Sequence, residues 1–394
     1  MKLNYIKDAV TLMVAAMSFT ACNDWTEIES VNDTDLNGTI KTEEDYAALR
    51  AWKETPGLPQ VFVWFDNWTG ISPTGENSLR GLPDSVTIAS NWGGHPKFDL
   101  TPERKADMEY VQKVKGTKVV VTLFSENIGD DVEHQDIFDT AGNSMDPEVV
   151  RPAIKAYAEA IYNECIKCGY DGYDWDYEPA GGMGNGQLWV NKVQRTIFVE
   201  ELSYWFGKGA MDPNRDRGDR KMPERRLLFL IDGEVGIRTG MDKEWLSYYV
   251  DYFVLQAYGG GSLDMRVHGV IEDMSKWIDE GIITKDEIVR RTILTENFES
   301  YANTGGGFLN MSKYIYRGYW NYDQEVDQQI GGCGLYRVGF DYNQGKGDYN
   351  GSPEYYFLRQ GITNLYQIFY DRLNHTQGET ELSLIHISEP TRPR

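Results

Sequence analysis

The sequence has few basic residues, few histidines and hardly any long apolar run. Lys and Arg number 39 against 61 Asp and Glu, and no basic cluster offsets the resulting net charge of −22. Such a surface repels nucleic acid and favours a neutral or weakly charged ligand. Because the 5 histidines are scattered along the chain, we expect no metal site and no cofactor. After residue 22, no segment is apolar enough to span a bilayer.

Cysteine is scarce as well, with 4 residues that include one closely spaced pair, Cys165 and Cys168. This spacing occurs in redox and zinc motifs. Here it falls at the end of a predicted helix, with no second pair and no nearby histidine. We therefore expect two half-buried helix residues, and a local disulfide is the alternative.

Aromatic residues, in contrast, are plentiful, at 13% of the chain with 11 Trp and 25 Tyr. Flat aromatic faces and Tyr hydroxyls are common in sugar-binding clefts, although such residues also pack around barrels. The 41% of hydrophobic residues predicts an ordinary globular core.

The start of the chain is typical of a processing signal. Two lysines and an apolar stretch over 9–19 lead to Thr20-Ala21-Cys22, which resembles a bacterial lipobox. We therefore predict a lipoprotein signal peptide over 1–22, with lipidation of Cys22 and an anchor in the bacterial outer membrane, at the cell surface or the periplasmic face. An ordinary secretory signal is the alternative.

Between the two ends of the chain, apolar strand runs alternate with amphipathic helices. Eight strands are predicted, at 59–68, 85–94, 117–126, 170–179, 226–234, 250–258, 291–299 and 332–341. Predicted helices include 42–54, 101–116, 146–168, 187–206 and 352–373, and residues such as Thr101 and Asp146 are suited to cap them. Eight short strands that alternate with helices predict an α/β protein with a (β/α)8 TIM barrel.

The predicted barrel forms a single domain over 56–375. Residues 23–55 would form a tether and an N-terminal helix ahead of it. A tail over 376–394 follows the barrel, and its residues 382–394 resemble the translation of a sequencing-library adapter. We expect that last segment to be non-native.

The most informative segment lies on the fourth predicted strand. Asp174, Asp176 and Glu178 are two residues apart, so their side chains point to one face of the strand. The opposite face is aromatic and suits contact with helices, which directs the acids into the barrel. Burying three carboxyls together is costly for a fold. It is useful for catalysis, because burial and like charge raise a carboxyl pKa until the group can donate a proton near neutral pH.

Glu178 comes last of the three, at the C-terminal mouth where barrel enzymes have their active sites. We therefore predict that Glu178 is a general acid. A solvated acidic edge strand and a metal site formed by the same carboxylates are the alternatives.

The segment 171–178 fits the pattern D-G-x-D-x-D-x-E and resembles the signature of glycoside hydrolase family 18. The resemblance implies hydrolysis of a β-linked N-acetylglucosamine (GlcNAc) bond with retention, in which the acetamido group of the substrate is the nucleophile. It implies that Glu178 protonates the leaving oxygen and then activates water. Asp176 would orient the acetamido N–H, and Asp174 would hold Asp176 by sharing a proton.

Gln256 and Tyr258 on the sixth predicted strand add to this resemblance. In the family, a Tyr at this place hydrogen-bonds the acetamido carbonyl, so Tyr258 is a predicted catalytic residue. Gln-x-Tyr is typical of endo-β-N-acetylglucosaminidases, whereas many chitinases have Met-x-Tyr-Asp. Chitinases of the family also carry Ser-x-Gly-Gly on the third strand, where this chain has Phe-Ser-Glu-Asn-Ile-Gly over 124–129. This departure weakens the chitinase interpretation.

Further sugar contacts are expected near the ends of the predicted strands, and position at the mouth is the only argument for most of them. The predicted substrate-binding residues are Gln256, Trp64, Asp66, Asn91, Trp92, Glu126, Asp232, Glu296 and Asn297.

The features together predict an extracellular endo-β-N-acetylglucosaminidase that cleaves the β-1,4 GlcNAc–GlcNAc core of N-linked glycans. A chitinase or chito-oligosaccharidase is one alternative, and a surface glycan-binding protein that has lost the chemistry is another. Each would bind a GlcNAc-containing oligosaccharide. The sequence does not set the oligomeric state, and a monomer is the default expectation.

Overall fold

The structure is a computed structural model that describes residues 41–93, 97–133, 137, 142–179, 185–237, 244–323, 325–343 and 354–376. Several sequence-based predictions fall outside these residues. They are the signal peptide with Cys22, the tether up to residue 40, the first residues of the last predicted helix, and the tail from residue 377 onwards.

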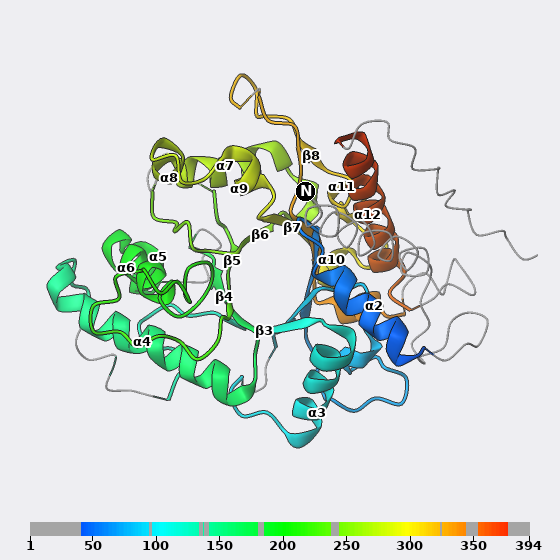
Figure 1. Cartoon of the computed structure of the whole chain (residues 1–394), viewed down its shortest axis with the longest axis horizontal. Helices are drawn as coiled ribbons and strands as arrows, with labels where there is room; N and C mark the ends of the chain where they lie inside the picture. Colours follow the sequence, from blue (N-terminus) through cyan, green and yellow to red (C-terminus); the bar gives the residue numbers. More distant parts are fainter. Residues whose placement is uncertain are drawn as a thin grey trace, which may run out of the picture.

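Eight parallel strands form a closed barrel in the order β1-β10-β7-β6-β5-β4-β3-β2. Their bounds are β1 Gln60–Phe65, β2 Ile88–Asn91, β3 Lys118–Leu123, β4 Gly172–Tyr177, β5 Leu228–Gly233, β6 Tyr252–Gln256, β7 Thr292–Asn297 and β10 Gly332–Tyr336. Each strand lies within one of the eight predicted segments. Helices surround the ring of strands (Figure 1), so the predicted (β/α)8 barrel is confirmed.

The helices differ widely in length. They are α2 Glu43–Lys53, α3 Pro102–Tyr110, α4 Pro147–Cys168, α5 Gln187–Val190, α6 Lys192–Leu202, α7 Leu263–Asp273, α8 Ser275–Asp279, α9 Lys285–Val289, α10 Phe298–Tyr301, α11 Phe308–Met311 and α12 Tyr356–Thr376. Short turns of other helical types are η1 Leu79–Gly81, η2 Val111–Lys115, η4 Tyr258–Gly260 and η5 Val338–Asp341. A small antiparallel sheet, β8 Ile315–Tyr316 with β9 Gln328–Gln329, is separate from the barrel.

Helix ends follow the capping residues of the sequence. The side chains of Thr101 and Asp146 accept backbone N–H groups at the starts of α3 and α4. Gly169 ends α4 in the left-handed conformation that glycine adopts readily. The helix predicted over 187–206 is divided into α5 and α6, because Asn191 leaves the helical geometry and its side chain caps α6.

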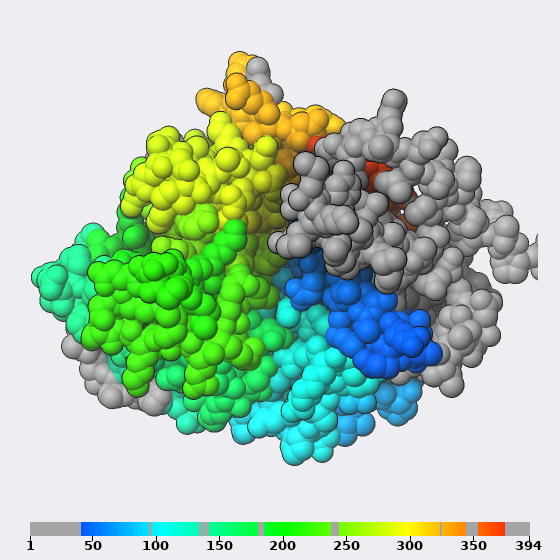
Figure 2. Space-filling view, viewed as in Figure 1, coloured from blue at the N-terminus to red at the C-terminus, as the bar shows by residue number. Residues whose placement is uncertain are grey.

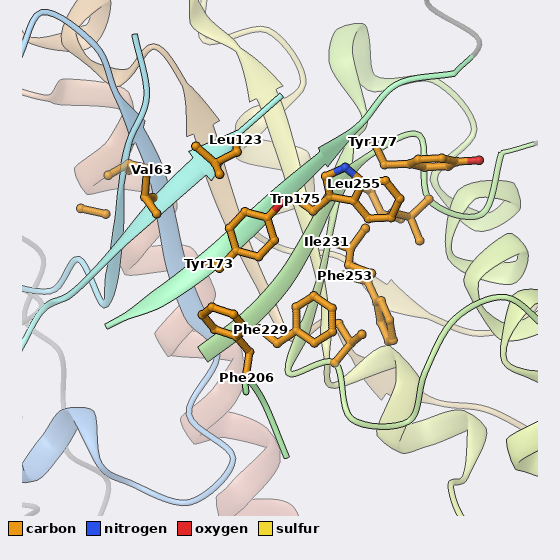
Figure 3. Packing of buried hydrophobic residues seen from close by; sticks show 14 of the residues in the cluster. Val63, Leu123, Tyr173, Trp175, Tyr177, Phe206, Phe229, Ile231, Phe253 and Leu255 are labelled. Atoms are coloured by element: carbon orange, nitrogen blue, oxygen red, sulfur yellow. The ribbon is translucent and has the colours of Figure 1, made fainter. Parts of the chain in front are cut away.

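Apolar side chains cover both faces of the barrel wall. Alternate residues of the strands form a small cluster inside the barrel: Phe62, Trp64, Ile88, Val120, Leu230, Val254 and Ile293. The outer faces of the strands join the helices in a larger cluster, part of which is shown in Figure 3. There, β4 presents Tyr173, Trp175 and Tyr177 outward, and the ring of Trp175 lies 5.0 Å from that of Phe198 on α6. The outward direction of these aromatic residues agrees with the alternation read from the sequence.

Helix α2 lies beside the ring of strands, against the N-terminal ends of β2 and β3 (Figure 1). Nζ of Lys53 donates to the carbonyl of Val86 at 2.8 Å and to Oγ1 of Thr117 at 2.9 Å, just before β2 and β3. Nε1 of Trp52 donates to the hydroxyl of Tyr370 on α12 at 2.7 Å. Figure 2 shows α2 in blue on this face. The opposite end, where the strands finish, is the end at which barrel enzymes have their active sites.

The cysteines of the described residues, Cys165, Cys168 and Cys333, are buried and free. Cys165 and Cys168 lie on α4 as predicted, but they are buried rather than half-buried, and the alternative disulfide is not found. Within the parts of the chain that the structure describes, no helix is long and apolar enough to cross a membrane.

Candidate active site

Strand β4 directs two carboxyls into the barrel and a third to its mouth. Asp174 and Asp176 expose only 0% and 5% of their surface. Glu178 follows the strand directly at its C-terminal end and is partly exposed. The structure therefore brings the three predicted acids together, and Glu178 is the most exposed of them.

Asp174 is held by side chains from two other strands. Its Oδ2 accepts hydrogen bonds from Oγ1 of Thr122 on β3 at 2.7 Å and from Nε1 of Trp64 on β1 at 3.2 Å. Burial raises the pKa of Asp174 to about 6, although the hydrogen bonds that it accepts oppose this rise. Trp64, predicted as a sugar contact, is buried inside the barrel and positions an acid of the cluster.

Gln256, the last residue of β6, joins the carboxyls to one another. Its Nε2 lies 2.5 Å from Oε1 of Glu178, 3.1 Å from Oδ1 of Asp232 and 3.4 Å from Oδ1 of Asp176. An amide nitrogen has two hydrogens to donate, so three carboxyls compete for two donors. A methionine at this position would have no N–H to donate.

Asp232 on β5 lies inside the carboxyl cluster. It is the register partner of Asp176 on the neighbouring strand and exposes 1% of its surface. Burial, together with the charges of Asp174, Asp176 and Glu178, raises the pKa of Asp232 well above its usual value. Burial and the charges of Glu178 and Asp174 likewise raise the pKa of Asp176. The cluster therefore favours neutral carboxyls beside Glu178.

Tyr258 follows β6 and faces the same acids. Burial, and then the charges of Asp232, Asp176 and Glu178, raise the pKa of its phenol well above the usual value. The hydroxyl therefore keeps its proton and is available as a hydrogen-bond donor. The four predicted catalytic residues, Glu178, Asp176, Asp174 and Tyr258, thus belong to one site.

Aromatic rings continue from Tyr258 along the mouth. Tyr336, the last residue of β10, has its ring 5.9 Å from that of Tyr258, 4.9 Å from that of Trp92 and 6.1 Å from that of Trp64. Tyr336 is not among the residues predicted from the sequence. The alternation of β10 could have identified it, because Cys333 and Leu335 belong to the outer core and the residues between and after them point inward.

Asp66 and Glu126 follow β1 and β3 at other parts of the mouth. Oδ2 of Asp66 accepts a hydrogen bond from Nε of Arg337 at 2.8 Å. Asp66 also lines a pocket with residues that include Phe65, Asn67, Phe340 and Asn343. Glu126 is partly exposed, and its backbone N–H donates to Asp130 at 3.0 Å. For both residues, contact with a sugar stays a prediction.

Two of the predicted sugar contacts do not face the mouth. Asn91 lies on the outer face of β2, where its Nδ2 donates to the hydroxyl of Tyr170 at 2.5 Å. Glu296 lies on the outer face of β7, is fully buried, and accepts hydrogen bonds from backbone N–H groups. A third residue, Asn297, faces inward, but its Oδ1 caps α10 by accepting from the N–H of Ser300 at 3.3 Å.

The arrangement offers a defined chemistry at the mouth of the barrel. One partly exposed carboxyl, Glu178, stands beside buried carboxyls whose pKa values are raised, and beside the donors of Gln256 and Tyr258. Such a group can transfer a proton to a leaving oxygen while its neighbours orient a polar group of a neutral substrate. The aromatic rings provide flat surfaces for that substrate.

Comparison with known proteins adds independent information. The family model described as "Glycoside hydrolase family 18, BT1044-like" matches residues 26–362. No curated protein matches the chain. A solved structure of a form of BT1044 is 24% identical, with 88% of this chain and 98% of that chain covered and a TM-score of 0.60.

Two further structures are of an endo-β-N-acetylglucosaminidase from Cordyceps militaris. The apo form is 18% identical, with 83% of this chain and 97% of that chain covered and a TM-score of 0.52. A variant in complex with fucosyl-N-acetylglucosamine-Asn is 16% identical with the same coverage and a TM-score of 0.51. At these identities, the likeness shows a shared fold.

Proposed function

The chain belongs to glycoside hydrolase family 18, in its BT1044-like group, and from this premise we propose that it is an endo-β-N-acetylglucosaminidase that cleaves the GlcNAc–GlcNAc core of N-linked glycans. The observation that carries the proposal is the amide of Gln256, which donates to Glu178 and reaches Asp176. The Gln-x-Tyr pattern that supplies this amide is typical of endo-glycosidases of the family.

One partly exposed carboxyl, that of Glu178, carries out both proton transfers of the reaction. Glu178 gives its proton to the glycosidic oxygen, and the acetamido oxygen of the sugar forms a bond to the anomeric carbon as the glycosidic bond breaks. Glu178 then takes a proton from water, and the water oxygen opens the oxazolinium ring, so the configuration at the anomeric carbon is retained. The acids around it, Asp174, Asp176 and Asp232, are buried and expose at most 5%.

Asp176 and Tyr258 act on the acetamido group. Asp176 accepts its N–H and stabilises the positive charge that develops on the ring, while the Tyr258 hydroxyl donates to the acetamido oxygen and directs it to the anomeric carbon. The raised pKa of Tyr258 keeps that donor protonated at neutral pH. Asp174 precedes Asp176 on β4 and supports it, and hydrogen bonds from Trp64 and Thr122 fix Asp174 in place.

A glycoprotein glycan also suits the surroundings of the site. The partly exposed rings of Trp92, Tyr258 and Tyr336 lie next to one another at the mouth, where a pyranose ring can stack on them. The fold is shared with the Cordyceps endo-β-N-acetylglucosaminidase, one structure of which contains fucosyl-N-acetylglucosamine-Asn. The acidic chain, with its net charge of −22, favours an uncharged glycan over a polyanion.

Mass spectrometry of a high-mannose and a complex-type glycoprotein after incubation with the enzyme tests the proposal. We expect one of them to keep a single GlcNAc per site. Glu178→Gln should lower the rate by about a hundredfold to ten-thousandfold, because it removes the proton donor. Glu109→Gln, which changes an exposed carboxyl on α3, is the matched control.

Two other results would contradict the proposal. Cleavage of free chito-oligomers without cleavage of either glycoprotein would identify a chitinase-type enzyme. Binding of glycans without turnover, unaffected by Glu178→Gln, would identify a glycan-binding protein.

A further inference from the structure

Strand β5 brings a fourth inward carboxyl, Asp232, against the acids of β4. Asp232 and Asp176 are register partners, and the Asp232 carboxyl lies within hydrogen-bonding reach of the carboxyls of Asp174 and Asp176. Asp174 and Asp232 expose 0% and 1% of their surface. A hydrogen bond between two carboxyls requires that one of them carries a proton.

The hydrogen-bond partners show which oxygens are left for that bond. Oδ2 of Asp174 accepts from Thr122 and Trp64, and Oδ1 of Asp232 accepts from Gln256. The other two oxygens, Oδ1 of Asp174 and Oδ2 of Asp232, are buried and have no donor among the described residues. Two such oxygens are costly to bury without a partner. One proton between them satisfies both.

The surroundings of the two carboxyls differ in a way that decides where the proton resides. Asp174 receives two donors of its own, and hydrogen bonds to a carboxylate stabilise its charged form. Asp232 receives one donor, the Gln256 amide, which it shares with Glu178 and Asp176. The two hydrogen bonds therefore stabilise an anion at Asp174 more than at Asp232, and the proton resides on Asp232.

We propose that Asp232 is a neutral carboxylic acid that donates a hydrogen bond to Asp174, keeps Asp174 as an anion, and acts as a positioning residue for Asp176. The direction of the pKa shifts agrees with this assignment, because the pKa of Asp174 rises only to about 6 whereas that of Asp232 rises well above its usual value. The family resemblance implied a proton shared between Asp174 and Asp176. In this chain, β5 supplies a further carboxyl that takes over the proton.

This inference deepens the proposed function, and its kinetic test rests on that function. A matched pair of variants provides the test. In Asp232→Asn, the amide N–H replaces the acid O–H as donor to Asp174, so we expect only a modest fall in kcat. In Asp174→Asn, the anion that faces Trp64 and Thr122 is lost, and we expect kcat to fall about tenfold or more below that of Asp232→Asn. Asp232→Ala removes the donor and should resemble Asp174→Asn. A larger loss of kcat in Asp232→Asn than in Asp174→Asn would overturn the proposal. Equal losses of kcat in Asp232→Asn and Asp232→Ala would overturn it as well.

The pH profile provides a second readout, because it distinguishes a neutral Asp232 from an ionised one. The ionisable groups that face Asp232 are Asp174, Asp176 and Glu178 from β4 and Tyr258 beyond β6. Glu178 must hold its proton to act as the general acid, so its ionisation sets the alkaline limb of the profile. A neutral Asp232 adds no charge beside Glu178, so Asp232→Asn should leave this limb in place. An ionised Asp232 would instead keep the proton on Glu178 up to a higher pH, so a shift of the limb to lower pH in Asp232→Asn would contradict the proposal.

Infrared spectroscopy tests the proton position without any substrate. A protonated carboxyl has a carbonyl stretching band that a carboxylate lacks. At neutral pH, Asp232→Asn should remove one such band, and Asp174→Asn should leave it in place. The opposite result would place the proton on Asp174 and overturn the inference. This outcome does not depend on which glycan the enzyme cleaves, so it separates a failure of the inference from a failure of the proposed function.

Discussion

Oε1 of Glu296 accepts a hydrogen bond from the backbone N–H of Gly259 at 2.9 Å, and Gly259 directly follows the predicted catalytic Tyr258. The other oxygen of Glu296 accepts from the N–H of Gly307 at 2.7 Å. Glu296 is fully buried on the outer face of β7. One carboxylate therefore fixes two loops of the rim to β7, and one of these loops carries Tyr258.

Glu296→Gln should weaken both the fold and the reaction. The amide nitrogen of glutamine cannot accept from a backbone N–H, so one buried N–H loses its partner. We expect the free energy of unfolding to fall by about 1–3 kcal/mol. We also expect a lower kcat, because Tyr258 is less firmly placed. Urea denaturation and initial rates measure the two effects, with Glu109→Gln as the exposed control. A variant with unchanged stability and unchanged kcat would show that Glu296 does not hold the rim.

Asp176→Asn separates the substrate-assisted mechanism from other routes to hydrolysis. An amide at this position cannot stabilise the positive charge on the oxazolinium ring, so we expect kcat to fall by about a hundredfold or more. The fold should remain intact, because the substitution removes a charge that burial and the neighbouring Glu178 and Asp174 already disfavour. Initial rates and thermal melts check the two expectations. Normal turnover in this variant would rule out the proposed role of the acetamido group.

The sequence was sufficient for the barrel and for the direction of the β4 acids. It was not sufficient for residues at the ends of other strands. Consecutive residues of a strand point to opposite faces, so Asn91 and Trp92 could not both reach the mouth. The same holds for Glu296 and Asn297. Parallel strands of a barrel are apolar on both faces, and their composition does not reveal which residue of each pair points inward.

The contact between Asp232 and Asp176 depends on geometry that no local pattern contains. These residues are 56 positions apart and meet because β4 and β5 pair in one particular register. The register between strands follows from the stagger of the whole barrel. Sequence reasoning could place Asp232 near the mouth, but its proton-sharing position beside Asp174 follows only from the closed sheet.

A buried carboxyl far along the chain from the β4 acids makes the stability of the fold depend on pH. Asp341 is fully buried and accepts hydrogen bonds from the backbone N–H groups of Phe357 at 3.2 Å and Leu358 at 2.8 Å, at the start of α12. Burial nevertheless raises its pKa to about 8. The folded protein therefore holds a proton on Asp341 that the unfolded chain releases near pH 4.

This difference in pKa sets the sign of the effect. A carboxyl whose pKa is raised by folding contributes stability that is present below its unfolded pKa and is lost as pH rises through its folded pKa. Between about pH 4 and pH 8, the unmodified protein should lose up to about 1.4 kcal/mol per pH unit relative to Asp341→Asn, which does not titrate. Above about pH 8, the difference between the two proteins should stop changing. Urea denaturation of both proteins at pH 5, 6, 7 and 9 measures it, and parallel pH dependences would show that Asp341 is already ionised in the folded state.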